Sequence, residues 1–109
     1  MSNLLHARCQ AKGVHAMSET EIWHHLSEVS GWQVKGGAIE KTFAFKDFYE
    51  TIAFVNALAW ICNTEDHHPD LAVSYSRCVT RFSTHSVDGI SRNDFICAAK
   101  ADALVSFVA

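Results

Sequence analysis

The chain of 109 residues is 49% hydrophobic and 19% charged, which predicts one globular domain with a substantial core and excludes a disordered chain. Its formal net charge of -3, with seven neutral histidines, argues against a nucleic-acid-binding surface, because such a surface needs a basic stripe. No apolar run approaches the roughly 18 residues that span a bilayer, and the first residues lack the apolar core of a signal peptide, so we expect a cytoplasmic protein.

The first predicted elements are an arm and a short helix. Residues 1–16 lack periodicity, so we expect an extended or partly ordered arm before a single domain over residues 17–109. The stretch MSETEI then predicts a helix that begins with a capping box, in which Ser18 and Glu21 each bond the other's backbone. Gly31 ends this helix.

A β-hairpin follows the first helix. Polar and apolar residues alternate through WQVKGGAIEKTFAF, and the Gly36-Gly37 pair permits a tight turn between the two strands. Lys41 breaks the apolar row of the second strand.

A long apolar helix begins after Asp47, which is predicted to form a second capping box with Glu50. Apolar residues lie on one stripe at helical spacing: Phe48, Ile52, Val55 and Ala59. Much of the remaining surface is apolar too, with Phe54, Leu58 and Ile61. This pattern indicates either a deep position in the core or a contact with another subunit.

A second hairpin and a third helix complete the chain. The runs LAVS and RCVTRFSTH, joined at Tyr75-Ser76, are rich in β-branched and aromatic residues. The last helix begins at Ser91, with Asp94 completing its capping box. Two hairpins separated by helices predict an α+β fold, a four-stranded antiparallel sheet with three helices packed on one face.

The register of the second hairpin predicts where the histidines meet. A turn at Tyr75-Ser76 places Ser74 opposite Arg77, and directly opposed residues lie within about 5.5 Å at Cβ. If the ladder continues past Pro69, it makes three further pairs: His68 with Ser83, His67 with Thr84, and Asp66 with His85. Three histidines should then converge on one end of the hairpin.

These residues resemble the pterin-4a-carbinolamine dehydratase family. The matching positions are Asp66-His67-His68-Pro69-Asp70, Tyr75, Ser83-Thr84-His85, Gly89-Ile90-Ser91 and Asp94. The resemblance implies a four-stranded antiparallel sheet with three helices, a homodimer or homotetramer, and no cofactor or metal. It also implies that His67 and His85 are acid–base catalysts and that His68 positions the pterin.

The implied reaction is the dehydration of 4a-hydroxytetrahydropterin to quinonoid dihydropterin, which supports tetrahydrobiopterin recycling. The leaving hydroxyl must be protonated and a ring nitrogen must lose its proton, and histidine titrates near the neutral pH that such transfers need. Asp66 could anchor the polar edge of the pterin, as could backbone groups at Ser83 and Thr84. One position departs from the family, because Asn63 stands where an acidic residue is usual.

Other interpretations remain open beside the enzyme. Relatives of this fold act as dimerisation partners or assembly factors without catalysis, although such members can lose the histidines that this chain keeps. A metal site is disfavoured, because adjacent His67 and His68 would point apart on extended backbone. The remaining histidines read as surface residues: His6, His15, His24 and His25. A role in capping the last helix is enough to explain why Asp94 occurs at its position.

The spacing of the four cysteines predicts neither a disulfide framework nor a structural zinc site. Cys9, Cys62, Cys78 and Cys97 are widely spaced and form no C-x-x-C pair. Disulfide frameworks belong to small secreted domains with weak cores, and structural zinc sites have paired ligands at short spacings. Free thiols, some of them buried as small apolar residues, are therefore predicted.

Overall fold

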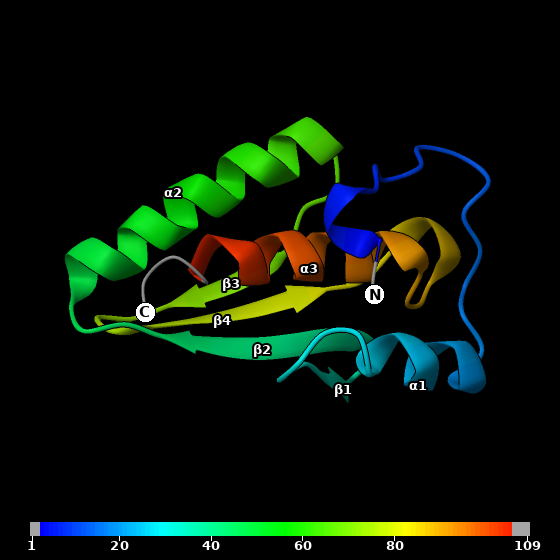
Figure 1. Ribbon diagram of the computed structural model, residues 1–109, viewed down its shortest axis with the longest axis horizontal. Coiled ribbons are helices and arrows are strands. Elements are labelled where there is room, and N and C mark those ends of the chain that lie inside the picture. Colours follow the sequence, from blue (N-terminus) through cyan, green and yellow to red (C-terminus); the bar gives the residue numbers. More distant parts are fainter. Residues whose placement is uncertain (1–2, 106–109) are drawn as a thin grey trace.

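The computed structural model describes residues 3–105. It contains one antiparallel sheet in the order β1-β2-β4-β3 and three α-helices (Figure 1). The strands are β1 (Gln33–Lys35), β2 (Ala38–Ala44), β3 (Asp70–Val73) and β4 (Arg77–Phe82). The helices are α1 (Glu19–Leu26), α2 (Phe48–Glu65) and α3 (Arg92–Val105), with two 3-10 turns, η1 (Leu4–His6) and η2 (His85–Val87).

The predicted α+β architecture is confirmed. Helices α2 and α3 lie against the same side of the sheet (Figure 1), and α1 packs on α3 through His25 and Phe95, whose ring centroids are 5.3 Å apart. The predicted arm and domain included residues 1–2 and 106–109, which lie outside the described part of the chain. No helix within residues 3–105 combines the length and the apolar character needed to cross a membrane.

Strand alternation defines the core face of the sheet. Along β4, Cys78, Thr80 and Phe82 are buried while the intervening residues are partly exposed, as expected for a sheet with one covered face. Lys41 lies on the covered side of β2, where its Nζ is 2.8 Å from Asp102 of α3. The charged residue in the apolar row is therefore explained by an ion pair that joins the sheet to a helix.

The buried face of α2 differs from the predicted stripe. The buried residues are Thr51, Phe54, Leu58 and Cys62, whereas Phe48 of the predicted stripe is 48% exposed. An almost uniformly apolar helix has no periodicity to distinguish its faces. The buried hydroxyl of Thr51 is satisfied by the carbonyls of Asp47 and Tyr75.

The helix caps match the predictions in part. The box between Ser18 and Glu21 is complete. At α2, Asp47 accepts from the backbone of Glu50, but the Glu50 carboxylate accepts from Lys46 N rather than from Asp47 N. The second box is thus only half formed, because the Glu50 carboxylate bonds the N–H of the residue before the cap.

The second hairpin has the predicted register but a shorter ladder. Asp70 pairs with Arg81, and Ser74 N donates to Arg77 O over 2.9 Å. The three pairs predicted beyond Pro69 do not form as strand pairs. Proline has no N–H to donate, and Thr84 instead forms an isolated bridge with Gly89.

The N-terminal residues pack onto α3. Leu4 is 2% exposed and belongs to the core. Residues 7–18 contain neither helix nor strand, yet Met17 N donates to Ile90 O over 2.7 Å. The segment of residues 3–10 therefore covers α3 and the end of α2.

Candidate active site

The three predicted histidines share one cleft at the end of the second hairpin. The cleft has a volume of about 360 Å³, which is in the range of small-molecule sites. Its lining residues are Asp66, His67, His68, Pro69, Asp70, Ser83, Thr84, His85 and Ser86. Every residue that the sequence predicted for the site is among them, although the strand pairs expected to gather them are absent.

The end of α2 separates the two adjacent histidines. Asp66 caps the helix in the left-handed conformation, with φ 52° and ψ 44°, which a residue other than glycine rarely adopts. His67 N then donates to Cys62 O over 3.1 Å. After this turn the His67 ring reaches Asp94, whereas the His68 ring reaches back to Asn63.

His67 is held by a buried carboxylate. Its Nε2 lies 2.6 Å from Oδ1 of Asp94, and the two side chains are 12% and 0% exposed. The ring also stacks on Phe82, with centroids 6.2 Å apart and an interplanar angle of 14°. Because a carboxylate oxygen accepts, Nε2 donates and Nδ1 is left to exchange protons.

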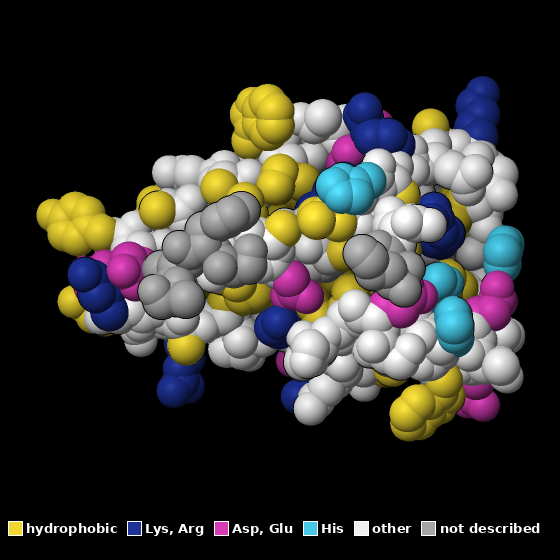
Figure 2. All heavy atoms as spheres, in the orientation of Figure 1, with side chains coloured by type: hydrophobic (Ala, Val, Ile, Leu, Met, Phe, Trp, Pro, Cys, Tyr) yellow, Lys and Arg dark blue, Asp and Glu magenta, His cyan; other side chains and the backbone are white. Residues whose placement is uncertain are grey.

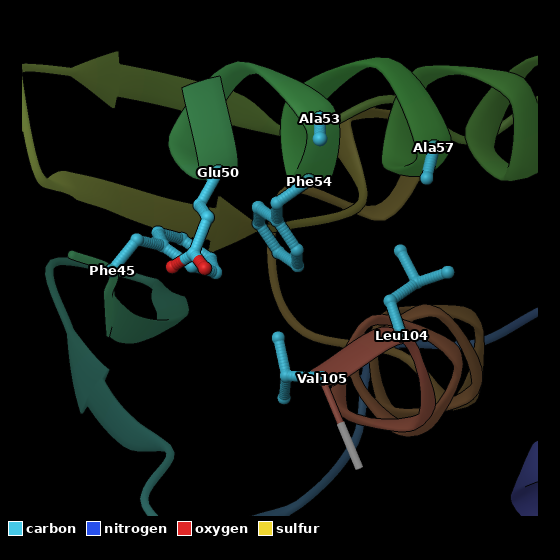
Figure 3. Close-up of a pocket in the computed structure, with 7 residues that line it drawn as sticks. All are labelled: Phe45, Glu50, Ala53, Phe54, Ala57, Leu104 and Val105. Atoms are coloured by element: carbon cyan, nitrogen blue, oxygen red, sulfur yellow. The ribbon is translucent and has the colours of Figure 1, made fainter. Parts of the chain in front are cut away.

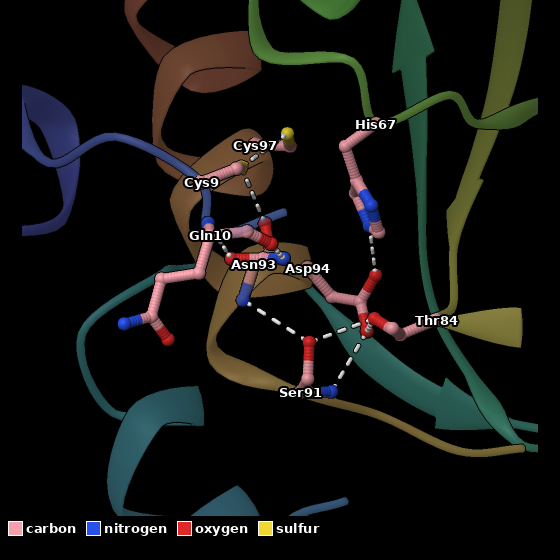
Figure 4. A network of polar contacts seen from close by, with 8 residues as sticks. All are labelled: Cys9, Gln10, His67, Thr84, Ser91, Asn93, Asp94 and Cys97. Atoms are coloured by element: carbon pink, nitrogen blue, oxygen red, sulfur yellow. Dashed lines mark hydrogen bonds and ion pairs between the residues drawn. The ribbon is translucent and has the colours of Figure 1, made fainter. Parts of the chain in front are cut away.

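Asp94 connects this histidine to the start of α3 (Figure 4). Its Oδ2 accepts from the Thr84 hydroxyl and from Ser91 N, each over 2.9 Å. Thr84 and Ser91 also bond each other through their hydroxyls over 2.7 Å. One carboxylate therefore caps a helix and orients a ring, and capping explains only its contact with Ser91 N.

Thr84 already has partners for its polar groups. Its hydroxyl donates to Asp94, its N–H donates to Gly89 O over 2.8 Å, and the residue is 5% exposed. It lines the cleft as a support for Asp94. Ser83, beside it, is partly exposed.

His68 and His85 are both exposed. His68 Nε2 lies 3.0 Å from Oδ1 of Asn63, so the residue that replaces the usual acid contacts the second histidine of the doublet. His85 begins η2, and within residues 3–105 its ring has no hydrogen-bond partner.

Glu65 points away from the cleft, as its place on α2 predicts. Its carboxylate accepts from Cys9 N over 2.8 Å and from Arg8 Nε over 2.9 Å. Burial raises the pKa of Glu65, but the Cys9 N–H and the charges of Arg8 and Lys100 outweigh it and hold the pKa below its usual value. Glu65 therefore anchors the N-terminal segment rather than a histidine.

Metal ligands do not gather in the part of the chain that the structure describes. No three histidine, cysteine or acidic side chains within residues 3–105 are placed to hold an ion together. Within the cleft, the rings of His67 and His68 cannot readily bind one ion together, because they point to different hydrogen-bond partners.

A second cavity lies between α2 and the end of α3 (Figure 3). It has a volume of about 190 Å³, and Glu50 is the one charged side chain among the described residues that line it. Hydrophobic side chains also stand out from the surface along α2 (Figure 2), where Tyr49 is 88% and Trp60 is 72% exposed. Neither feature brings titratable groups together, so the histidine cleft is the candidate active site.

Comparisons with known proteins identify the family. The family model described as pterin 4 alpha carbinolamine dehydratase matches residues 15–104. A Stenotrophomonas maltophilia protein whose name refers to this dehydratase is 55% identical over 105 residues, covering 93% of this chain and 90% of its own. A Bdellovibrio bacteriovorus protein with the same name is 57% identical over 93 residues, covering 82% and 78%. The crystal structure of a transcriptional coactivator/pterin dehydratase from Brucella melitensis matches with a TM-score of 0.80 and 34% identity, over 83% of this chain and 98% of that one. The chain therefore belongs to the pterin-4-alpha-carbinolamine dehydratase family.

Proposed function

We propose that this protein dehydrates 4a-hydroxytetrahydrobiopterin, or a closely related 4a-hydroxytetrahydropterin, to the quinonoid dihydropterin. It is then a hydro-lyase that works in the cytoplasm in tetrahydrobiopterin recycling and needs no cofactor. The observation that carries the proposal is the cleft in which three histidines meet and one of them is held by a buried carboxylate. Family membership supports the reaction type.

His67 is proposed as the base. Its Nε2 donates to Asp94, so Nδ1 can take the proton that the pterin ring nitrogen loses. The imidazolium that forms is stabilised by the buried carboxylate 2.6 Å away. The electron pair of the broken N–H bond forms the new C=N bond as the C4a–O bond breaks.

His85 is proposed as the acid. Its exposed ring gives a proton to the leaving hydroxyl, which departs as water. His68 is proposed to position the pterin, together with Asp66 and the backbone of Ser83. After each turnover, His67 gives its extra proton to solvent and His85 takes a new proton from solvent.

The test is a dehydratase assay on wild type beside single alanine variants of the three histidines. General acid–base groups typically contribute roughly 10²–10⁴-fold, so His67→Ala and His85→Ala should each lower kcat by about that factor. His68→Ala should instead raise KM, because it removes binding shared by ground and transition states. Circular dichroism must show that each variant folds. A folded His67→Ala/His85→Ala double variant with near wild-type turnover would refute the proposal.

We further propose that the protein is a homodimer or homotetramer. Exposed aromatic side chains on α2 and strand β3, which forms one edge of the sheet and whose four residues are exposed, are surfaces that a second subunit would cover. Light scattering after size exclusion should give a multiple of 12.1 kDa. A monomer at micromolar concentration would contradict the proposal.

The same apolar surface of α2 favours a second candidate function, binding of another protein without catalysis. The similar protein from Brucella melitensis is described as a transcriptional coactivator as well as a pterin dehydratase. The two functions separate in the histidine variants, because a binding role through α2 would survive the loss of His67 and His85 whereas dehydration would not.

A further inference from the structure

Three thiols lie together where the N-terminal segment crosses α3. Cys9 Sγ is 3.6 Å from Cys97 Sγ (Figure 4), and Cys62 of α2 belongs to the same buried core cluster as Cys97. Cys62 is 1% exposed and Cys97 is 0% exposed, whereas Cys9 is partly exposed. This cluster takes no part in the proposed dehydration.

Hydrogen bonds on both sides hold Cys9 in place. Cys9 N donates to Glu65 over 2.8 Å. The next residue, Gln10, forms a reciprocal pair with the Asn93 side chain, with N to Oδ1 at 2.9 Å and Nδ2 to O at 2.8 Å. The two sulfur atoms are therefore kept side by side by contacts that do not depend on a bond between them.

Access distinguishes the members of the cluster. An oxidant in solution can reach partly exposed Cys9, but not Cys62 or Cys97. The pKa of Cys97 is raised, first by its contacts with Cys62 and Cys9 and then by burial, so Cys97 is a protonated thiol at rest. Oxidation of the cluster would therefore begin at Cys9.

We propose that Cys9 and Cys97 form an intrachain disulfide when a hydroperoxide oxidises the protein. The Cys9 thiol reduces the peroxide O–O bond and becomes a sulfenic acid, while the peroxide leaves as an alcohol or water. The Cys97 sulfur, losing its proton, then attacks the Cys9 sulfur, and the sulfenic oxygen leaves with that proton and its own as water. In forming the bond, the sulfurs would approach from 3.6 Å to about 2.05 Å.

The disulfide would act as a strap on the N-terminal segment. It would join positions 9 and 97, which enclose most of the chain, and a cross-link over a long loop restricts the unfolded state most. The segment already lies against α3 in the reduced protein, so the bond would fix an existing contact. It would leave the contact between His67 and Asp94 in place.

The test treats the fully reduced 109-residue protein with hydrogen peroxide, then unfolds it in denaturant and blocks free thiols with iodoacetamide, because the remaining cysteines are buried in the folded protein. Intact mass should show the loss of two hydrogens and two alkylated cysteines, and a non-reducing digest should contain a linked Cys9–Cys97 peptide. Cys9→Ser should abolish the link, whereas Cys62→Ala and the matched control Cys78→Ser should retain it. Cys78 is a suitable control because it is a buried cysteine on β4 whose thiol contacts Thr80 rather than the cluster.

Thermal unfolding tests the strap. The oxidised wild type should melt roughly 5 °C or more above the reduced protein, and dithiothreitol should reverse the rise. A linked Cys62–Cys97 peptide, a sulfinic acid without any link, or no loss of hydrogens would each overturn the pairing. A disulfide that forms without a rise in melting temperature would contradict the proposal that it stabilises the fold.

Discussion

The substitution Asp94→Asn isolates the contact with His67. In the wild type, Oδ2 accepts from Thr84 and Ser91 while Oδ1 faces His67 alone. An asparagine that keeps its oxygen at the Oδ2 position retains both of those bonds and presents an N–H to Nε2. His67 must then carry its proton on Nδ1, which is the atom proposed to receive the substrate proton.

The expected costs differ widely in size. Replacing one charge-assisted bond by a neutral one should destabilise the fold by only about 1 kcal/mol. The wrong tautomer and the missing carboxylate should lower kcat by roughly 10²–10⁴-fold, the usual contribution of a general base. KM should change little, because Asp94 is 0% exposed and does not reach the substrate.

Two measurements check this reasoning beside the dehydratase assay. Nitrogen NMR of labelled histidine should show the proton of His67 moving from Nε2 to Nδ1 in Asp94→Asn. Ser91→Ala is the matched control, since it removes a cap hydroxyl that bonds Thr84 but leaves the carboxylate on His67. It should cost about 1 kcal/mol of stability with kcat within a few-fold of wild type. If folded Asp94→Asn keeps wild-type kcat, the carboxylate is structural and His67 is not the base.

Three further predictions concern other contacts. Asn63→Asp should favour the imidazolium form of His68, because a negative charge replaces an amide 3.0 Å from Nε2; in an NMR titration the His68 ring signals should change at higher pH than in wild type, and unmoved signals would count against the contact. Lys41→Met should destabilise the protein by about 1–3 kcal/mol, because it leaves partly buried Asp102 without its cation; denaturant unfolding of the single and double variants should give a coupling energy, and a value of zero would contradict the ion pair. The lowered pKa of Glu65 means that its carboxylate stabilises the fold above the unfolded-state pKa and stops doing so as pH falls through the folded value. Wild type should therefore exceed Glu65→Gln in stability at pH 7 and lose that advantage below about pH 4, whereas a difference that does not vary with pH would exclude this linkage.

Local signals in the sequence were enough to predict the elements and the convergence of the three histidines. The capping box at Ser18 and the glycine pair at Gly36-Gly37 act within a few residues, so they predict the first helix and the first hairpin without tertiary information. The pairing of Ser74 with Arg77 set the register of the second hairpin, and that register predicted that the three histidines meet at one end of the sheet.

Contacts that depend on tertiary packing could not be predicted in the same way. The buried side of α2 includes Thr51, whose hydroxyl is satisfied by the carbonyls of Asp47 and Tyr75, and the hydrophobic pattern of the helix gave no sign of this. The contact between His67 and Asp94 joins a loop to a helix start 27 residues later. Asp94 fits a capping box so well that its sequence context gave no reason to seek a second partner.

The docking of Leu4 on α3 bears on the order in which the core forms. Leu4 lies in the same buried cluster as Phe95, Ile96 and Ala101 of α3, so this part of the core joins residues that are far apart in the sequence. Contacts of large sequence separation cost loop-closure entropy before they stabilise the fold. We therefore expect the segment of residues 3–10 to close over α3 late in folding, after the local helices and hairpins have formed.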